Sequence, residues 1–152
     1  MKIFIDTNVI LDLYFPDRGG QIEAAQIVDL ARKDQQIRVY ISILSVANTA
    51  YSLRKRVGKE ESVKCMKELF HSVNTLPMSD ICYYNALKSD CPDFEDALQI
   101  FCADDGNCDV IITRDKKHFG AYTDIPVYTP KEFLDKLQAA QESSLTPSTS
   151  CI

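Results

Sequence analysis

The first twelve residues, 1–12, read M-K-I-F-I-D-T-N-V-I-L-D. A short apolar run at 2–5 ends at Asp6, and a second run, D-V-I-I-T at 109–113, ends two residues before Asp115. Short apolar runs without alternation suit strands that are buried on both faces, as in a parallel sheet covered by helices. The two runs therefore predict two buried strands, each followed closely by an acid.

The rest of the chain switches between strand and helix patterns. Apolar runs at 38–43 and 73–76 predict two further strands. Between the strands, apolar residues recur at helical spacing in three segments. These are Ile22, Ala25, Ile27 and Leu30; Val46, Ala50 and Leu53; and Val63, Met66, Leu69 and Phe70. Such alternation predicts an α/β fold, a three-layer α/β/α sandwich with a central, mostly parallel sheet.

Several predicted helices begin with a recognisable capping residue. Ser45, Asp93 and Thr129 each stand where a side-chain oxygen can accept the free amide protons of a first turn. Thr129 is followed by Pro130 and by Glu132 at the capping-box position. We expect this last helix to end near Ala140.

The composition is that of one globular domain. The chain has 152 residues, of which 45% are hydrophobic and 26% are charged, close to the averages for soluble proteins. We expect residues 1–140 to form a single domain and the Ser- and Thr-rich residues 141–152 to form a flexible C-terminal tail. The longest uncharged stretch, 39–53, is too short and too polar to span a bilayer. The first apolar run is too short for a signal peptide, so we expect a cytoplasmic protein.

Charge and cysteine content exclude several classes of protein. Seventeen Lys and Arg against 22 Asp and Glu give a net charge of −5, which argues against binding nucleic acid by bulk charge. A polyanionic substrate must therefore be bound by a local group of basic residues. The six cysteines form no C-x-x-C pair and the chain has two His, so no zinc site or redox motif is evident. We expect reduced, mostly buried thiols.

Three aspartates stand where an open parallel sheet binds ligands, outside the carboxyl ends of its strands. Asp6 and Asp115 follow strands, and Asp96 lies in D-F-E-D, 93–96, at the opening turn of a helix. Three of the acids have an ordinary structural explanation: Asp93 as an N-cap, Asp96 as a partner of the helix dipole, and Asp115 as a turn residue. Asp6 is harder to explain structurally because it lies amid apolar residues.

Convergence of Asp6, Asp96 and Asp115 would require a cation. Two carboxylates about 4 Å apart repel by roughly 4 kcal/mol at an effective dielectric constant of 20, so a partly buried cluster needs a cation or a proton. Without Cys or His nearby the ligands are all oxygen, which suits Mg²⁺ or Mn²⁺. Such an ion can lower the pKa of a water and stabilise charge on a phosphoryl oxygen. The chemistry predicted for the three aspartates is metal-assisted phosphodiester hydrolysis.

Three segments carry a resemblance to a known family. They are M-K-I-F-I-D-T-N-V-I-L-D at 1–12, D-F-E-D-A-L-Q at 93–99, and D-V-I-I-T-R-D-K-K-H-F at 109–119 followed by I-P-V-Y-T-P-K-E-F-L at 125–134. In order and spacing they resemble the PIN domain, the nuclease fold of bacterial VapC-type toxins, over nearly all of residues 1–138.

The resemblance implies a Mg²⁺- or Mn²⁺-dependent ribonuclease that acts on an RNA substrate, often pairs with an antitoxin protein and is often a homodimer. By position, Asp6 and Asp115 match acidic ligand positions after strands, and Asp96 matches the acid on the helix. Asp93 would be an accessory at most. Asn8 and Thr113 are candidates for polar groups that orient the acids from behind, although Asn8 could equally cap the following helix.

One position departs from the family pattern. The family usually has Glu or Asp in the helix after the second strand, where S-I-L-S-V-A-N-T-A-Y of this chain has Asn48. Asn offers a carbonyl oxygen but no charge, so a cation would meet three carboxylates in place of four. We therefore expect weaker metal affinity, and the departure leaves open a branch that kept the fold and lost the activity.

Two basic runs could contact RNA phosphates. They are Arg54, Lys55, Arg56 and Lys59, at the end of the helix that carries Asn48, and Lys116, Lys117 and His118, just after Asp115. The ordinary alternative is a solvated face, or favourable charge at a helix C-terminus. His71 and His118 have no nearby nucleophile, and both are interpreted as surface residues.

Three functional hypotheses follow. The first is a divalent-metal-dependent ribonuclease of the PIN fold, a candidate toxin of a toxin–antitoxin pair. The second is a catalytically impaired PIN-fold module that binds RNA or a protein partner, its site weakened by Asn48. The third is a haloacid-dehalogenase-like phosphatase with Asp6 as nucleophile. That family has the motif D-x-D-x-T/V after the first strand, and here Asn8 replaces the second acid.

Overall fold

A parallel sheet forms the centre of the molecule. The computed structural model describes residues 1–145. Within them the sheet has five strands in the order β3-β2-β1-β4-β5, and every neighbouring pair is parallel. The strands are β1 (Lys2–Ile5), β2 (Arg38–Ser42), β3 (Asn74–Leu76), β4 (Val110–Ile112) and β5 (Val127–Tyr128).

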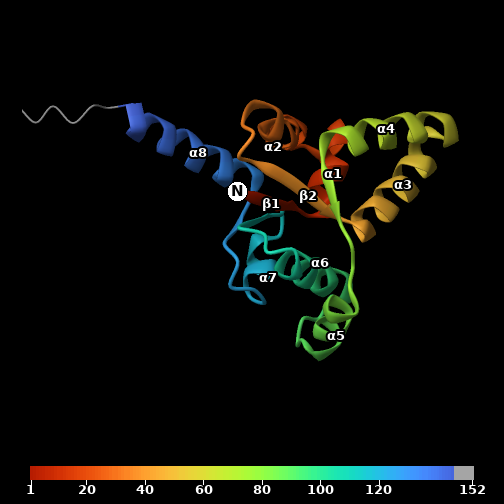
Figure 1. The fold of residues 1–152 in the computed structure, drawn as a ribbon. Coiled ribbons are helices and arrows are strands. Elements are labelled where there is room, and N and C mark those ends of the chain that lie inside the picture. Colours follow the sequence, from red (N-terminus) through yellow and green to blue (C-terminus); the bar gives the residue numbers. More distant parts are fainter. Residues whose placement is uncertain (146–152) are drawn as a thin grey trace, which may run out of the picture.

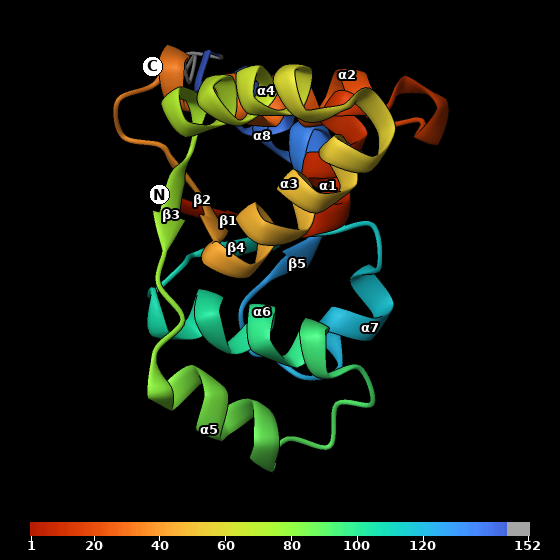
Figure 2. The same cartoon turned by 90° about the vertical axis from the view of Figure 1, so that its right-hand side faces the viewer.

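Helices cover both faces of the sheet (Figures 1 and 2). One layer contains α1 (Thr7–Tyr14), α2 (Gln21–Lys33), α3 (Ile43–Val57), α4 (Lys59–Ser72) and α8 (Pro130–Leu145), with the short 3₁₀ helix η1 (Pro16–Arg18) after α1. The other layer contains α5 (Asp80–Lys88), α6 (Phe94–Asp105) and α7 (Lys116–Gly120). The predicted three-layer α/β/α sandwich with a parallel sheet is confirmed.

The alternation of side chains along β1 divides the core in two. Ile3 and Ile5 belong to the apolar cluster shared with α1, α2 and α8, while Phe4 belongs to the cluster shared with α6 and α7. Successive residues of a strand point to opposite faces of a sheet, so one continuous apolar run can serve both layers. All three side chains are fully buried.

Two of the three predicted helix caps are confirmed. The Asp93 carboxylate accepts hydrogen bonds from the backbone N–H groups of Glu95 and Asp96, and Thr129 forms the capping box with Glu132. The prediction for Ser45 is wrong, because α3 begins three residues earlier than this cap implies, at Ile43, and its N-cap is Ser42, whose hydroxyl accepts from the Ser45 N–H.

The last helix is longer than the sequence predicts. It continues past Ala140 to Leu145, with the Gln138 side chain bonded to Glu142 and the Ser143 hydroxyl bonded to the Ala139 carbonyl. Contacts at i, i+4 of this kind support a helix beyond the point where apolar periodicity stops. The remainder of the expected tail, residues 146–152, lies outside the described residues.

Short elements escape sequence reasoning. The sequence does not predict α5, α7 or β5, and α7 and β5 have only five and two residues. Periodicity needs a longer window than these elements provide. None of the helices in residues 1–145 is long and apolar enough to cross a membrane.

The described cysteines are unpaired thiols, as expected. Five are described, of which Cys82, Cys102 and Cys108 are buried and Cys65 and Cys91 are partly buried. Cys151 lies outside the described residues.

Candidate active site

The carboxyl ends of β1 and β4 form the centre of the candidate site. In the strand order β3-β2-β1-β4-β5, β2 and β3 are added on one side of β1, and β4 and β5 are added on the other side. The boundary between β1 and β4 is therefore the switch point of the topology, where open parallel sheets bind ligands. The backbone N–H of Asp6 donates to the Ile112 carbonyl over 3.0 Å, so the residues after the two strands start side by side.

Asp6 is a buried carboxylate with one unsatisfied oxygen. The residue is only 1% exposed. The Thr113 hydroxyl donates to Oδ2 over 2.9 Å, whereas Oδ1 has no hydrogen-bond partner among the described residues. Burial raises the pKa of Asp6, while the hydrogen bond from Thr113 lowers it. A buried carboxylate oxygen without a partner is costly, and a cation would satisfy it.

Buried polar side chains of Thr7, Ser42, Ser45 and Gln99 surround the start of α1, next to Asp6. The hydroxyls of Thr7 and Ser45 are 2.8 Å apart, and the Ser42 and Ser45 hydroxyls are 3.0 Å apart. Gln99 Oε1 accepts from Ser45 Oγ over 3.2 Å and from the Thr7 N–H over 3.3 Å. These bonds join the ends of β1 and β2 to α3 and α6, so they fix where the acids of α6 lie relative to Asp6.

The first turn of α6 brings acids toward Asp6. Asp93 Oδ1 accepts from the N–H of Glu95 over 2.9 Å and from the N–H of Asp96 over 3.1 Å, so Asp93 serves as the N-cap. Burial, followed by the negative charges of Asp93 and Asp6, raises the pKa of Asp96 to about 6, and contact with His118 lowers it. The Asp96 carboxylate therefore shares the electrostatic field of Asp6.

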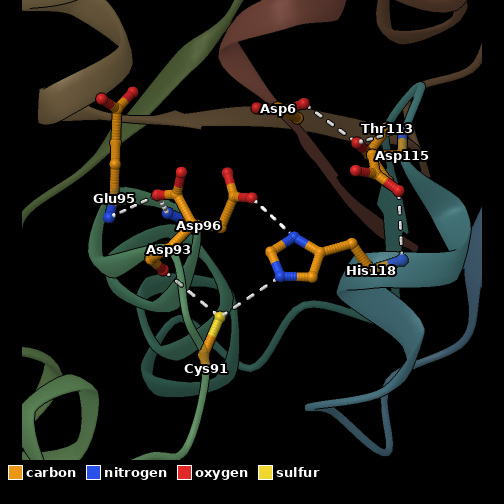
Figure 3. A network of polar contacts seen from close by, with 8 residues as sticks. All are labelled: Asp6, Cys91, Asp93, Glu95, Asp96, Thr113, Asp115 and His118. Atoms are coloured by element: carbon orange, nitrogen blue, oxygen red, sulfur yellow. Dashed lines mark hydrogen bonds and ion pairs between the residues drawn. The ribbon is translucent and has the colours of Figure 1, made fainter.

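His118 lies inside the site, so its interpretation as a surface residue is wrong. Its Nδ1 is 2.9 Å from Asp96 Oδ2, its Nε2 is 3.9 Å from Cys91 Sγ, and its side chain is only 24% exposed (Figure 3). The ring belongs to α7, a helix that the sequence does not predict. Without that helix, nothing in the sequence indicates that the ring turns toward α6.

Asp115 caps α7. Its Oδ1 accepts from the His118 N–H over 3.1 Å, and its own N–H donates to Thr113 Oγ1 over 3.1 Å. Thr113 thus lies between Asp6 and Asp115, as expected for a residue that orients both acids (Figure 3). The ordinary and functional interpretations of Asp115 are compatible, because its exposed carboxylate has a second oxygen.

The acids do not form a closed cage. Among the side chains that the structure describes, no three His, Cys, Asp or Glu lie close enough together to hold a metal ion as they stand. Asp96 is engaged with His118, and Asp115 with the first turn of α7. What the arrangement offers is carboxylate oxygens near Asp6, and two of these carboxylates, Asp96 and Asp115, are held by hydrogen bonds that an ion would have to displace. The expectation that no Cys or His lies nearby is wrong, because His118 contacts Asp96 and Cys91 contacts His118.

Asn48 meets an acid that sequence reasoning missed. Its Nδ2 donates to Glu95 Oε1 over 2.6 Å, across the gap between α3 and α6. Desolvation, then the charges of Asp93 and Asp6, raise the pKa of Glu95, and the bond from Asn48 lowers it. Glu95 is visible in the D-F-E-D motif, but its contact with α3 depends on how two distant helices pack.

Asn8 does not cap a helix. It lies inside the first turn of α1, whose N-cap position is Asp6, and its Oδ1 accepts from Arg18 Nη2 over 3.0 Å. Its role in orienting the acids stays a prediction.

The candidate RNA contacts differ in their surroundings. Arg56 pairs with Asp17 and lies over the Phe15 ring, 4.4 Å from its centroid. Lys116 pairs with Glu132 over 3.0 Å. The remaining three are exposed: Arg54, Lys55 and Lys117.

The fold has known counterparts. A family model described as the PIN domain matches residues 2–117. Among solved structures, VapBC2 from Rickettsia felis bound to a DNA fragment from its promoter is 16% identical with a TM-score of 0.68, and covers 85% of this chain and 98% of that chain.

Two further structures show the same fold. VapBC-1 from nontypeable Haemophilus influenzae is 19% identical with a TM-score of 0.66, covering 86% of this chain and 99% of that one. The sarcin-ricin loop cleaving toxin VapC20 of Mycobacterium tuberculosis is 18% identical with a TM-score of 0.62, covering 82% and 98%. No curated protein matches the chain. On the family match across most of its length, the chain belongs to the PIN domain family.

Proposed function

We propose that the protein is a divalent-metal-dependent endoribonuclease whose site is built from Asp6, Asp96 and Asp115. The observation that carries the proposal is the buried Oδ1 of Asp6, which has no hydrogen-bond partner among the described residues. Such an oxygen is expected where a cation completes the site. A structural neighbour, VapC20, is a toxin that cleaves the sarcin-ricin loop, which is consistent with RNA as substrate.

The carboxylates of Asp6, Asp96 and Asp115 are donors of the type that suits Mg²⁺ and Mn²⁺. PIN-domain nucleases generally use divalent metals, and carboxylate oxygens are the ligands that these two ions prefer. Asp6, Asp96 and Asp115 would hold the ion, and Glu95 would add negative charge at the place where Asn48 contributes none. When bound, the ion supplies positive charge for a phosphoryl oxygen and lowers the pKa of a water.

The remaining polar residues position the acids. The Thr113 hydroxyl donates to Asp6 and accepts from the Asp115 N–H, so one side chain orients the acids after both strands. His118 holds Asp96 Oδ2 and would release it when an ion binds. Partners that orient metal ligands in this way commonly contribute 10- to 100-fold to metal affinity or activity.

The structural neighbours suggest a cellular role. Two are VapBC complexes, one of them bound to promoter DNA. We therefore infer a cytoplasmic toxin that pairs with an antitoxin protein and forms a homodimer, with residues 1–140 as its single domain. The exposed Arg54, Lys55 and Lys117 are candidates for RNA contact, as are Arg56 and Lys116 where their ion pairs open.

RNA cleavage tests the proposal. The purified protein should cleave single-stranded RNA with Mn²⁺ or Mg²⁺, and chelator should stop it. Asp6→Asn should lower the rate by about a thousandfold, because a metal contributes several kcal/mol and each 1.36 kcal/mol is a factor of ten. Asp29→Asn, which removes a partly exposed acid of α2 away from the site, is the matched control. Cleavage that persists in chelator, or in Asp6→Asn, would disprove the mechanism.

A second function is favoured by one observation. Asn48 occupies a position where the family usually has an acid, and its amide ties up Glu95. The alternative is therefore an inactive PIN-fold module that binds RNA or a protein partner. Inactivity with every divalent ion, together with recovery of cleavage in Asn48→Glu, would favour this alternative over the nuclease.

A further inference from the structure

Asp12 holds two arginines from distant parts of the chain. It lies on α1, is 1% exposed, and accepts from Arg18 Nε and from Arg114 Nη1 at the same oxygen, Oδ1, over 2.8 Å each. Arg18 comes from η1, and Arg114 follows β4. One buried carboxylate thus balances two guanidinium groups, which leaves one positive charge in excess.

Both arginines remain open to solvent. The side chains of Arg18 and Arg114 are 30% and 46% exposed. A guanidinium carries five N–H donors in a planar fork that matches the geometry of a phosphate. Because Asp12 occupies one edge of each fork, donors remain for a second anion on the exposed side.

The arginine pair lies beside the candidate active site. Arg114 stands between Thr113, which bonds Asp6, and Asp115. Arg18 also donates from Nη2 to Asn8, one helical turn before Asp12 on the same face of α1 and two residues from Asp6. The two cations therefore adjoin both strand ends that carry the acids.

The backbone of Gly20 packs closely against the Asp12 carboxylate that binds the two arginines. Gly20 caps α2 with a positive φ of 78°, and a Cβ at this position would lie 3.1 Å from Asp12 Oδ2. Glycine allows this backbone conformation and the close approach to the carboxylate. The other basic side chains near the site differ, because Arg56 and Lys116 pair singly with exposed acids, Asp17 and Glu132.

We propose that Arg18 and Arg114 form a phosphate clamp that binds backbone phosphates of single-stranded RNA beside the acidic site, with Asp12 as the residue that positions both. The inference rests on the proposed function, because it identifies the residues through which a protein of net charge −5 binds a polyanionic RNA. Asp12 acts through the arginines and does not touch the RNA.

RNA binding without cleavage tests the clamp. The probe is a fluorescein-labelled oligouridylate of about 12 nucleotides, a length that a single-strand site can cover, followed by anisotropy in EDTA over a range of salt. Arg18→Gln and Arg114→Gln should each lower the slope of log K against log salt by about 0.7, which is about fivefold weaker binding at 0.1 M.

Two variants control for bulk charge. Arg38→Gln removes the same charge from an exposed residue at the amino end of β2, the opposite edge of the sheet, and should leave the slope unchanged. Arg114→Lys keeps the charge and should retain the salt slope while losing affinity through the lost fork. Asp12→Asn, checked by a thermal melt to be folded, adds positive charge; the clamp predicts weaker binding, whereas bulk charge predicts tighter binding.

The outcomes separate the clamp from the nuclease. Slopes for Arg18→Gln and Arg114→Gln equal to that of Arg38→Gln, or no RNA binding by the wild-type protein, would overturn the clamp even if the enzyme cleaves RNA. Tighter binding by folded Asp12→Asn would overturn the positioning role. Reduced slopes in a protein that fails to cleave RNA with any divalent ion would support the clamp and reject the nuclease.

Discussion

Asp6 and Asp12 are both 1% exposed and lie six residues apart, yet their surroundings differ completely. Asp12 has two arginines on one oxygen. Asp6 has one hydroxyl on Oδ2 and, among the described residues, nothing on Oδ1, and burial raises its pKa. A buried carboxylate normally needs an opposite charge to offset its desolvation.

The difference assigns distinct roles to two similar residues. Asp12 is compensated inside the protein, so its charge stabilises the fold and orients Arg18 and Arg114. Asp6 is not compensated inside the protein, so its charge costs stability until a cation arrives. Functional sites commonly retain such an unfavourable group because the ligand supplies the missing interaction. Measurements of metal binding, stability and pH dependence test this contrast.

Manganese should stabilise the protein through Asp6, and this is the largest effect we expect. A ligand that binds only the native state stabilises it by RT ln(1 + [L]/Kd), about 2.7 kcal/mol at a hundredfold excess over Kd. Millimolar Mn²⁺ should raise the melting temperature at pH 7.5, with smaller shifts for Ca²⁺ and Na⁺. Asp6→Asn should reduce the Mn²⁺ shift and raise the melting temperature of the metal-free protein, because it removes a desolvated charge.

Asp12 provides the control for this experiment. Asp12→Asn should leave the Mn²⁺ shift in place if the two aspartates have separate roles. An Mn²⁺ shift that survives in Asp6→Asn, or that vanishes in Asp12→Asn, would reverse the assignment.

Neutralising Asp12 should destabilise the fold, opposite in sign to neutralising Asp6. Asp12→Asn weakens two charge-assisted hydrogen bonds at a buried position, which should cost about 2 kcal/mol. The cost stays below that of a fully buried ion pair because Arg18 and Arg114 can return to solvent. Urea unfolding in EDTA measures both variants, and equal signs for Asp6→Asn and Asp12→Asn would contradict the contrast.

Glu95 should add a smaller increment to the charge around Asp6. Glu95→Gln keeps the size of the side chain and its contact with Asn48 while removing the negative charge that Asp6 and Asp93 already disfavour. We expect Mn²⁺ to bind about tenfold more weakly, which is about 1.4 kcal/mol. Glu23→Gln, on α2 away from the site, is the matched control in calorimetric titration. Unchanged Mn²⁺ affinity would remove Glu95 from the site.

Asn48→Glu tests the effect of added negative charge by placing a carboxylate on α3, opposite Glu95. It should tighten Mn²⁺ binding and lower the stability of the metal-free protein, because a carboxylate then faces Glu95 directly. A variant that is more stable in EDTA than the wild type would contradict this expectation.

Sequence reasoning succeeded where a residue's role depends on the strand that precedes it. Asp6 and Thr113 follow buried runs, and strand ends meet at one edge of a parallel sheet, so their proximity could be predicted from topology alone. Asp93 as a cap depends on three neighbouring residues, which the sequence also contains.

Sequence reasoning failed where a role depends on packing between distant segments. The contact of Asn48 with Glu95 spans 47 residues, and that of Asp12 with Arg114 spans 102. The expectation for His118 is wrong because α7 is too short to be recognised, so the direction of its ring could not be inferred. For Asp12 the sequence does contain a signal, since it is an acid at the end of the apolar run after Asp6.

The pH dependence of stability should give the smallest effect of the series. Burial and neighbouring acids raise the pKa of Asp96 from 3.8 to about 6, so in the folded metal-free protein its ionisation is unfavourable. Stability linked to this group is fully present below pH 4 and is lost as the pH rises through about 6. Because the Asp96 side chain keeps 22% of its surface in solvent, we expect a loss of about 1 kcal/mol, less than the pKa change alone implies.

Urea unfolding in EDTA between pH 4 and pH 8 measures this loss. Asp96→Asn should flatten the pH dependence while the residual slope from Asp6 remains, because burial also raises the pKa of Asp6. Saturating Mn²⁺ should reverse the trend, since the ion binds only the ionised acids. A metal-free protein whose stability rises from pH 4 to pH 7 would show that the carboxylates near Asp6 are already compensated, as Asp12 is, and that the contrast between the two aspartates is wrong.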